Sequence, residues 1–306
     1  MEKLKSYLGW NTDFTVPAGE PAYAAPDSIS WKVFKNPIAL AVGGVAAVLL
    51  EFADARIRSG VWDHSVFKTD PIGRSQRTGM AAMVGVYGPA SAARRVIQGV
   101  TNMHAKVGGK TPSGEDYKAL DVELLDWVSA TAGYGFLTAY DRFVKPVTYE
   151  EKCRFYEEGV EVAKLYGVET PLRKPEDFDA MLEKLLPRFE PHPINTEFLD
   201  IIKSGQAARN VPQALHRALA NASVSILPET VRDRLELGPD YDLSFAGRQA
   251  VKLAGKIAER TPIKGSPPAD AAIRLGLPWN FAWKSDGAKQ RILSEKAHQD
   301  VQAAAE

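Results

Sequence analysis

Residues 38–50 read IALAVGGVAAVLL, the longest unbroken apolar run of the chain, and Glu51 closes it. The run is shorter than the roughly 20 residues that a membrane-spanning helix needs. A helix that is apolar all round, yet too short to cross a membrane, belongs in the core of a large globular protein. The run therefore predicts a central helix that is buried on all sides, with the rest of the chain packed around it.

Helix start and stop signals follow this run. Asp70-Pro71 is a typical helix start, because Asp is a good N-cap and Pro is tolerated at the first helical position. Gly88-Pro89 ends the helix that begins there, and a second helix is predicted from Pro89 to about Val107. The two helices together form a predicted hairpin with its bend at Gly88.

Further helix signals are spread over the rest of the chain. They are a capping box at Thr148-Tyr149-Glu150-Glu151 that opens a helix ending near Gly167, a one-sided apolar pattern at Phe178, Met181, Leu182, Leu185 and Leu186, and a helical composition from Ser244 to Arg260. No stretch alternates β-branched and polar residues, so strands are at most minor. We predict an all-α fold with an N-terminal arm at 1–36, a single multi-helix domain at 37–260 and a C-terminal extension at 261–306.

Composition limits the functions that the chain can have. Among its 306 residues, 38 Lys plus Arg balance 38 Asp plus Glu, whereas nucleic-acid binders normally carry a basic excess. The single cysteine, Cys153, excludes an intrachain disulfide and a Cys-based zinc or iron–sulfur site. The start, MEKLKSYLGW, lacks the apolar segment of a signal peptide. We expect a cytoplasmic protein with no transmembrane segment and no nucleic-acid partner, and the oligomeric state is left open.

Several familiar cofactor motifs are incomplete. Gly109-Lys110-Thr111 resembles the end of a P-loop, but the first glycine of that motif would fall on His104. A di-iron bundle needs two Glu-x-x-His motifs, and only Glu295-x-x-His298 is present. Covalent attachment of haem through CxxCH is impossible with one cysteine, so any haem would be held non-covalently.

His104 occupies a distinctive position on the second helix of the predicted hairpin. Ile97, Val100 and His104 lie at i, i+3 and i+7, which places His104 on an apolar stripe. A buried imidazole needs a partner for its nitrogen, because leaving it unpaired is unfavourable. Two interpretations fit this position: a core histidine bonded to a backbone carbonyl, or an axial ligand that offers its neutral nitrogen to iron.

The first helix of the hairpin carries a cationic side. Arg74, Arg77 and Thr78 lie at i, i+3 and i+4, so they project from one side of the helix. A cationic fork beside a hydroxyl suits a bound O₂ or a developing oxyanion, and it equally suits an exposed helix terminus. With a bend at Gly88, Thr78 and His104 differ by an axial offset of roughly 9 Å. A porphyrin between the two helices spans such an offset.

Longer segments carry a resemblance to a known family. They read LLEFADARIRSGVWDHSVFKTDPIGRSQRTG, YGPASAARRVIQGVTNMHAKVGG, YKALDVELLDWVSATAGYGFLTAYDRF, FYEEGVEVAKLYGVETP and, more weakly, SILPETVRDRLELG. In this order, over about residues 37–240, the chain resembles the oxygenase family that contains the MpaB-type enzymes and the latex clearing protein (rubber oxygenase). The resemblance implies an all-helical fold that binds a b-type haem and uses O₂ to cleave carbon–carbon double bonds in isoprenoid chains.

The resemblance also implies roles for single residues. His104 in MHAKV matches the proximal haem ligand of the family, and Arg74 and Thr78 in RSQRT match its Arg and Thr on the distal side. Arg77 stands where the rubber-cleaving members have a lysine that can occupy the sixth iron position. Because arginine stays protonated, it cannot bind the iron. The closed state of the family, in which that lysine occupies the sixth iron position, is therefore not expected here. His64 in WDHS matches a common family position and is a second candidate for the iron ligand.

One departure from the family pattern lies close to these residues. The segment EFADA, which contains Asp54, stands where many members read EVAHP, and the change removes a histidine near the pocket. Tyr134, Phe136 and Tyr140 either line a channel for an apolar substrate or pack the core, and core packing is the simpler interpretation.

The sequence thus predicts a haem b-dependent oxygenase that acts with O₂ on a hydrophobic small molecule of the isoprenoid class. His104 is expected to bind the haem iron, Arg74 and Thr78 to contact the cofactor, and Arg74, Arg77 and Thr78 to act in catalysis. Two alternatives stay open: a haem or lipid carrier or sensor that keeps the oxygenase fold, and a helical protein without a cofactor.

Overall fold

Helices dominate the architecture, as the sequence predicts. The computed structural model describes residues 6–7, 10–206 and 212–305. Strands in these ranges form two small antiparallel hairpins. One pairs β1 (Ser6–Tyr7) with β2 (Trp10–Asn11), and the other pairs β3 (Gly108–Lys110) with β4 (Asp116–Lys118).

The apolar run forms α2 (Pro37–Phe52) at the centre of the molecule, where it packs along α6 (Val122–Phe143). Gly43 and Gly135 lie at the crossing, and a Cβ at Gly43 would come within 2.6 Å of the Gly135 carbonyl oxygen. The crossing therefore requires the small residues of the run. Most of α2 is buried, but Ala41 is exposed, so the expectation of burial on all sides was wrong at one edge of the helix.

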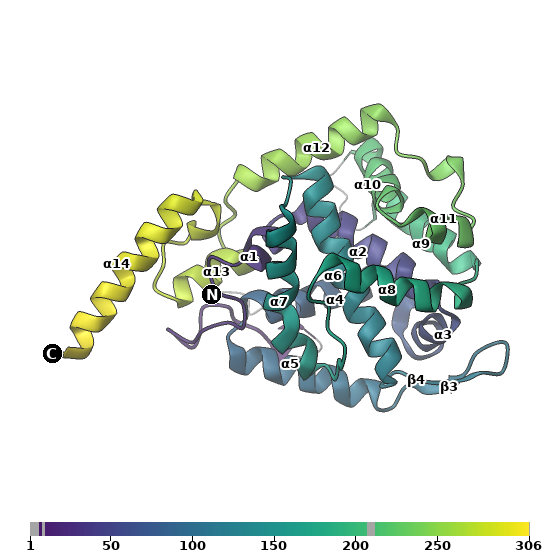
Figure 1. Cartoon of the computed structure of the whole chain (residues 1–306), viewed down its shortest axis with the longest axis horizontal. Coiled ribbons are helices and arrows are strands. Elements are labelled where there is room, and N and C mark those ends of the chain that lie inside the picture. The colour runs from purple at the N-terminus through teal and green to yellow at the C-terminus, as the bar shows by residue number, and fades with distance from the viewer. Residues whose placement is uncertain (1–5, 8–9, 207–211, 306) are drawn as a thin grey trace.

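The other helices lie around α2 and α6, apart from α14, which projects from the body (Figure 1). They are α1 (Ile29–Phe34), α3 (Ala55–His64), α4 (Pro71–Tyr87), α5 (Ala90–His104), α7 (Tyr149–Leu165), α8 (Pro175–Leu185), α9 (Pro193–Lys203), α10 (Gln213–Ser225), α11 (Glu229–Arg234), α12 (Phe245–Arg260), α13 (Pro267–Arg274) and α14 (Asp286–Ala305). Short 3₁₀ turns occupy Val66–Lys68, Leu186–Arg188, Pro239–Tyr241 and Phe281–Trp283.

Local capping explains why several helices begin where the sequence predicts. The Asp70 side chain accepts from the Gly73 N–H at 2.8 Å at the start of α4, and Thr148 and Glu151 form the expected capping box of α7. The second helix of the hairpin, α5, ends at His104 rather than near Val107. The chain leaves the helix there because it turns into the β3–β4 hairpin, where the Ala119 N–H donates to the Val107 carbonyl.

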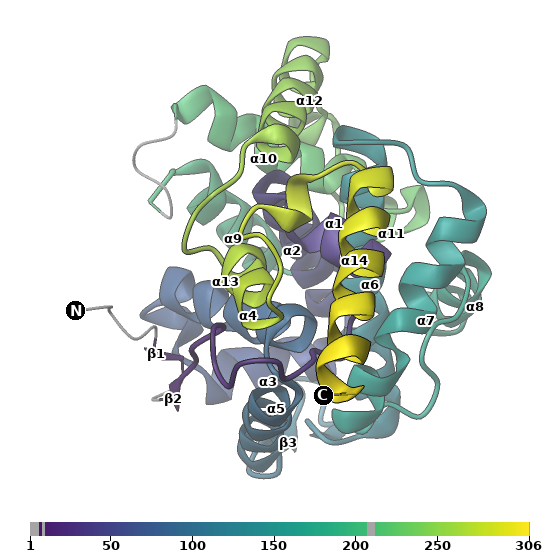
Figure 2. The same cartoon turned by 90° about the vertical axis from the view of Figure 1, so that its left-hand side faces the viewer.

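The described part of the N-terminal arm and α13 of the C-terminal extension pack onto the helical body. Within the predicted arm, residues 29–34 form α1, and its Trp31 is fully buried. Arg274 at the end of α13 donates to the carbonyl oxygens of Phe14, Glu20 and Tyr87 at 2.7–2.8 Å. The C-terminal extension therefore holds part of the arm in place, while α14 projects from the body (Figures 1 and 2). Among the helices that the structure describes, none combines the length and the apolar character needed to cross a membrane.

Candidate functional site

The C-terminal end of α2 comes together with α4, α5 and α6 around Arg74. Arg74 lies on α4 and is half-buried, with its guanidinium carbon 6.0 Å from the centre of the Phe67 ring. Its charge acts on Glu51 at the end of α2 and on His104 at the end of α5. The fold thus places Arg74 and His104 in one neighbourhood and adds Glu51 to them.

His104 is the last residue of α5 and is half-buried. Burial, together with the positive charge of Arg74, lowers the pKa of its imidazole below the usual 6.5. The ring is therefore neutral at pH 7, which is the form that can ligate a metal. Within the described ranges, the ring nitrogens have no hydrogen-bond partner. Of the two interpretations of His104, a bond to a backbone carbonyl is thus not present.

Glu51 is a titratable group that the sequence interpretation passed over. Burial raises the pKa of its carboxyl to about 7, and the nearby positive charge of Arg74 only partly opposes this rise. The Thr131 hydroxyl on α6 lies 3.5 Å from its Oε1. A carboxyl with this pKa exchanges a proton near neutral pH, as groups in acid–base catalysis do. The available signal in the sequence was a single acidic residue that ends an otherwise apolar helix.

Arg77 and Thr78 make their contacts within α4 and its N-cap. Arg77 Nη1 lies 3.4 Å from Asp70 Oδ2, and the Thr78 hydroxyl donates to the Arg74 carbonyl at 3.1 Å. Thr78 is exposed to solvent and Arg77 is partly so. Helical spacing places both residues close to Arg74 on α4. Their side chains bond to Asp70 and to a backbone carbonyl, not to the side chains of Glu51, Arg74 or His104.

The two remaining sequence candidates differ in their surroundings. Asp54, which the resemblance places where many members have a histidine, is buried as the N-cap of α3 and bonds the Arg56 side chain at 2.7 and 3.0 Å. A carboxylate at this position is therefore neutralised within its own helix start. His64, the second candidate for an iron ligand, is exposed at the end of α3, and its ring centre lies 6.5 Å from that of Tyr117. His104 is the more enclosed of the two histidines.

The residues of this neighbourhood suit a haem site better than a metal site with several protein ligands. Among the residues described, no three of His, Cys, Asp and Glu gather in a way that would hold a metal ion. A haem iron needs only one or two axial ligands from the protein. The imidazole of His104 is half-buried and neutral, lies near the charged Arg74, and has no hydrogen bond within the described part of the chain, so it fits that requirement.

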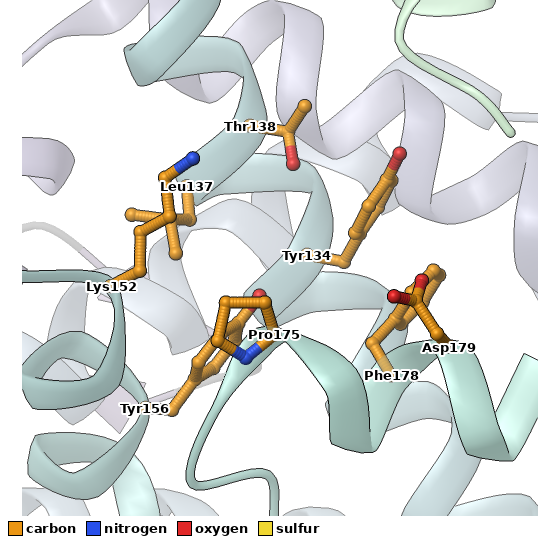
Figure 3. A pocket seen from close by; sticks show the side chains of 8 residues that line it. All are labelled: Tyr134, Leu137, Thr138, Lys152, Tyr156, Pro175, Phe178 and Asp179. Atoms are coloured by element: carbon orange, nitrogen blue, oxygen red, sulfur yellow. The ribbon is translucent and has the colours of Figure 1, made fainter. Parts of the chain in front are cut away.

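A separate pocket of about 200 Å³ lies between α6, α7 and α8 (Figure 3). Tyr134 lines it, with its ring stacked on Phe178 at 4.0 Å and its hydroxyl donating to the Ile226 carbonyl at 2.6 Å. Phe136 packs on Phe34 with ring centres 4.9 Å apart, and Tyr140 is buried. Core packing thus accounts for Phe136 and Tyr140, while Tyr134 both packs and lines a pocket.

Comparison with known proteins identifies the family. Residues 31–256 match a family model described as ER-bound oxygenase mpaB/B'/rubber oxygenase, catalytic domain. The chain therefore belongs to the mpaB/rubber oxygenase family, as the resemblance of its sequence segments predicted. The match begins within α1 and ends within α12, so it includes α2 and every helix of the Arg74 neighbourhood. Neither the curated proteins nor the solved structures contain a match to this chain.

Proposed function

We propose that this protein is a haem b-dependent oxygenase that acts with O₂ on a hydrophobic, isoprenoid-class small molecule, by cleavage of a carbon–carbon double bond or a related oxidation. The observation that carries the proposal is the neutral imidazole of His104, which lies beside Arg74 and has no hydrogen bond to any residue that the structure describes. Membership of an oxygenase family supports the reaction class. Haem and the substrate class come from the resemblance of the sequence to that family.

In this proposal His104 holds the cofactor. Its lowered pKa makes the ring nitrogen available at neutral pH without prior loss of a proton. His104 is the last residue of α5, and α5 packs against α4 and α7, so the backbone that carries the ring is held in place. When bound, haem supplies the binding and activation of O₂, while the protein supplies position and electrostatics.

Arg74 supplies a fixed positive charge. Its guanidinium stays protonated at every physiological pH and is partly shielded from water, so it stabilises negative charge that develops nearby. Arg77 and Thr78 are proposed as further polar groups of the same reaction. Because they are bonded to Asp70 and to the Arg74 carbonyl, they act after a change of side-chain rotamer.

Glu51 holds or releases a proton at its carboxyl oxygens. With a pKa of about 7, both protonation states are populated at neutral pH. The same carboxyl lies within the electrostatic reach of Arg74, so a change of charge on either group is felt by the other. We propose that Glu51 is the acid–base residue of the site.

The test is the visible absorption spectrum of the purified protein, with a pyridine haemochrome assay and a hemin titration. A Soret band at about one haem per chain that is lost in His104→Ala is the expected result. His64→Ala is the matched control, because it removes an exposed histidine from a neighbouring helix. Full haem content in His104→Ala, or a flat spectrum that hemin does not change, would refute the proposal.

Oxygen uptake then separates the oxygenase from a carrier of the same fold. The oxygenase consumes O₂ in the presence of a prenyl substrate, and Arg74→Met lowers that consumption while the haem content is retained. A protein that binds haem and a prenyl ligand under air without any O₂ consumption is a carrier.

A further inference from the structure

The outer face of α12 exposes large apolar side chains. Phe245, Leu253 and Ile257 are 78%, 61% and 57% exposed, and Ile263 just beyond the helix is 48% exposed. Their spacing along α12 places the three helical residues on one side. The opposite side of α12, with Val251 and Gly255, is buried against the body. The exposed apolar side is therefore not the one that stabilises the fold.

A row of basic residues runs beside this apolar stripe. Arg248, Lys252, Lys256 and Arg260 follow one another at intervals of four residues, and within the described part of the chain none of them forms an ion pair. The acidic residue of α12, Glu259, turns toward the body and pairs with Lys35 at 2.8 Å. The outer face of α12 thus carries only positive charge, although the chain as a whole has a net charge of +0.

The position of α12 leaves this face open. Figures 1 and 2 show α12 along the upper edge of the molecule, at the opposite end from α5 and the β3–β4 hairpin, with no described element above it. Beyond the C-terminal end of α12, Lys264 Nζ lies 5.1 Å from the centre of the Trp279 ring.

We propose that α12, together with Ile263, docks on the surface of an anionic phospholipid bilayer. A helix that lies in a membrane interface buries an apolar side with Phe and Leu among the acyl chains and keeps Lys and Arg beside the headgroups. The exposed apolar stripe of α12, with a basic row that forms no ion pair among the described residues, has this arrangement. The docking is peripheral and requires neither haem nor the oxygenase reaction.

Vesicle flotation with the full-length protein tests the proposal. Phosphatidylcholine vesicles with about 30% phosphatidylserine bind the protein, pure phosphatidylcholine vesicles bind it much less, and salt weakens the binding. The double variant Arg248→Gln/Lys256→Gln lowers the partition coefficient about 30-fold, since each basic residue close to an anionic surface strengthens binding about fivefold. Leu253→Ser/Ile257→Ser lowers it on anionic vesicles as well, because the apolar contact is lost.

Matched controls come from α14. Val301→Ser removes an apolar side chain that is 70% exposed, and Arg291→Gln removes an exposed charge, both away from α12. These variants leave vesicle binding unchanged if α12 is the docking surface. Three outcomes would each overturn the proposal. The protein binds both kinds of vesicle equally, or the α14 variants lose as much binding as the α12 variants. The third outcome is that vesicles stay unbound while light scattering shows a dimer that the α12 variants dissociate. Unaltered thermal unfolding confirms that the exposed substitutions leave the fold intact.

Discussion

Replacing Glu51 by Gln removes a carboxyl that the fold holds in an unfavourable environment for its charge. The pKa of this group is 4.5 in a solvated chain and about 7 in the folded protein. Each pKa unit corresponds to about 1.4 kcal/mol, so the ionised carboxylate lowers the folding stability by about 3 kcal/mol. Gln keeps the shape of the side chain and carries no charge.

The sign of the pH dependence follows from the two pKa values. Below pH 4.5 the carboxyl is protonated in both states, and Glu51→Gln has little effect. Between pH 4.5 and about 7 the unfolded chain loses the proton first, so the wild-type protein loses stability as the pH rises. Above pH 7 the whole difference of about 3 kcal/mol separates the variant from the wild type.

Urea unfolding of both proteins between pH 4 and pH 8.5 measures this difference directly. The variant is expected to be more stable at high pH, with the gap closing as the pH falls. Glu123→Gln is the matched control with the opposite sign, because Lys184 lowers the pKa of Glu123 and Arg56 adds to this effect. That variant loses stability at neutral pH. A Glu51→Gln variant whose stability equals that of the wild type at pH 8 would refute the argument, and so would a gap that does not depend on pH.

Other predictions follow from the packing and the charges. In Gly43→Ala the new Cβ meets a backbone carbonyl of α6 at 2.6 Å, so thermal unfolding should show a loss of folding stability of about 1–3 kcal/mol. Gly159 is a helical position with open space around it, so Gly159→Ala should instead raise the folding stability by about 0.5–1 kcal/mol. Arg274→Met leaves carbonyls of the arm without a donor, and a loss of about 3 kcal/mol is expected, with faster proteolysis of residues 12–24. Arg74→Met removes a charge that lowers the pKa of His104, so the imidazole should titrate closer to 6.5 by NMR; an unchanged titration would contradict the placement of Arg74.

Features that depend on local chemistry could be predicted from the sequence. The Asp70-Pro71 start of α4 and the Thr148 capping box act through neighbours a few residues away, and the apolar run of α2 is visible as an unbroken stretch of the chain. The end of α5 was misplaced because it depends on β4, which lies beyond the hairpin turn. The wrong prediction for Ala41 has a similar cause, since exposure depends on which distant helices cover α2.

The candidate site also combines residues that the sequence singled out with properties that depend on tertiary packing. Helical spacing placed His104 on an apolar stripe and grouped Arg74 with Arg77 and Thr78, and the family resemblance then selected His104 and Arg74 as candidates. Spacing placed Thr78 with them, yet its exposure is decided by how α4 packs. Glu51 reads in the sequence as the end of an apolar helix, and only the packing of α2 against α6 and the approach of Arg74 make it a group with a pKa of about 7. The sequence by itself determined the helices and the family, since helices and family segments are recognised from local sequence patterns. The tertiary structure decided the burial and the charge environment of each residue, since both are summed over groups far apart in the chain.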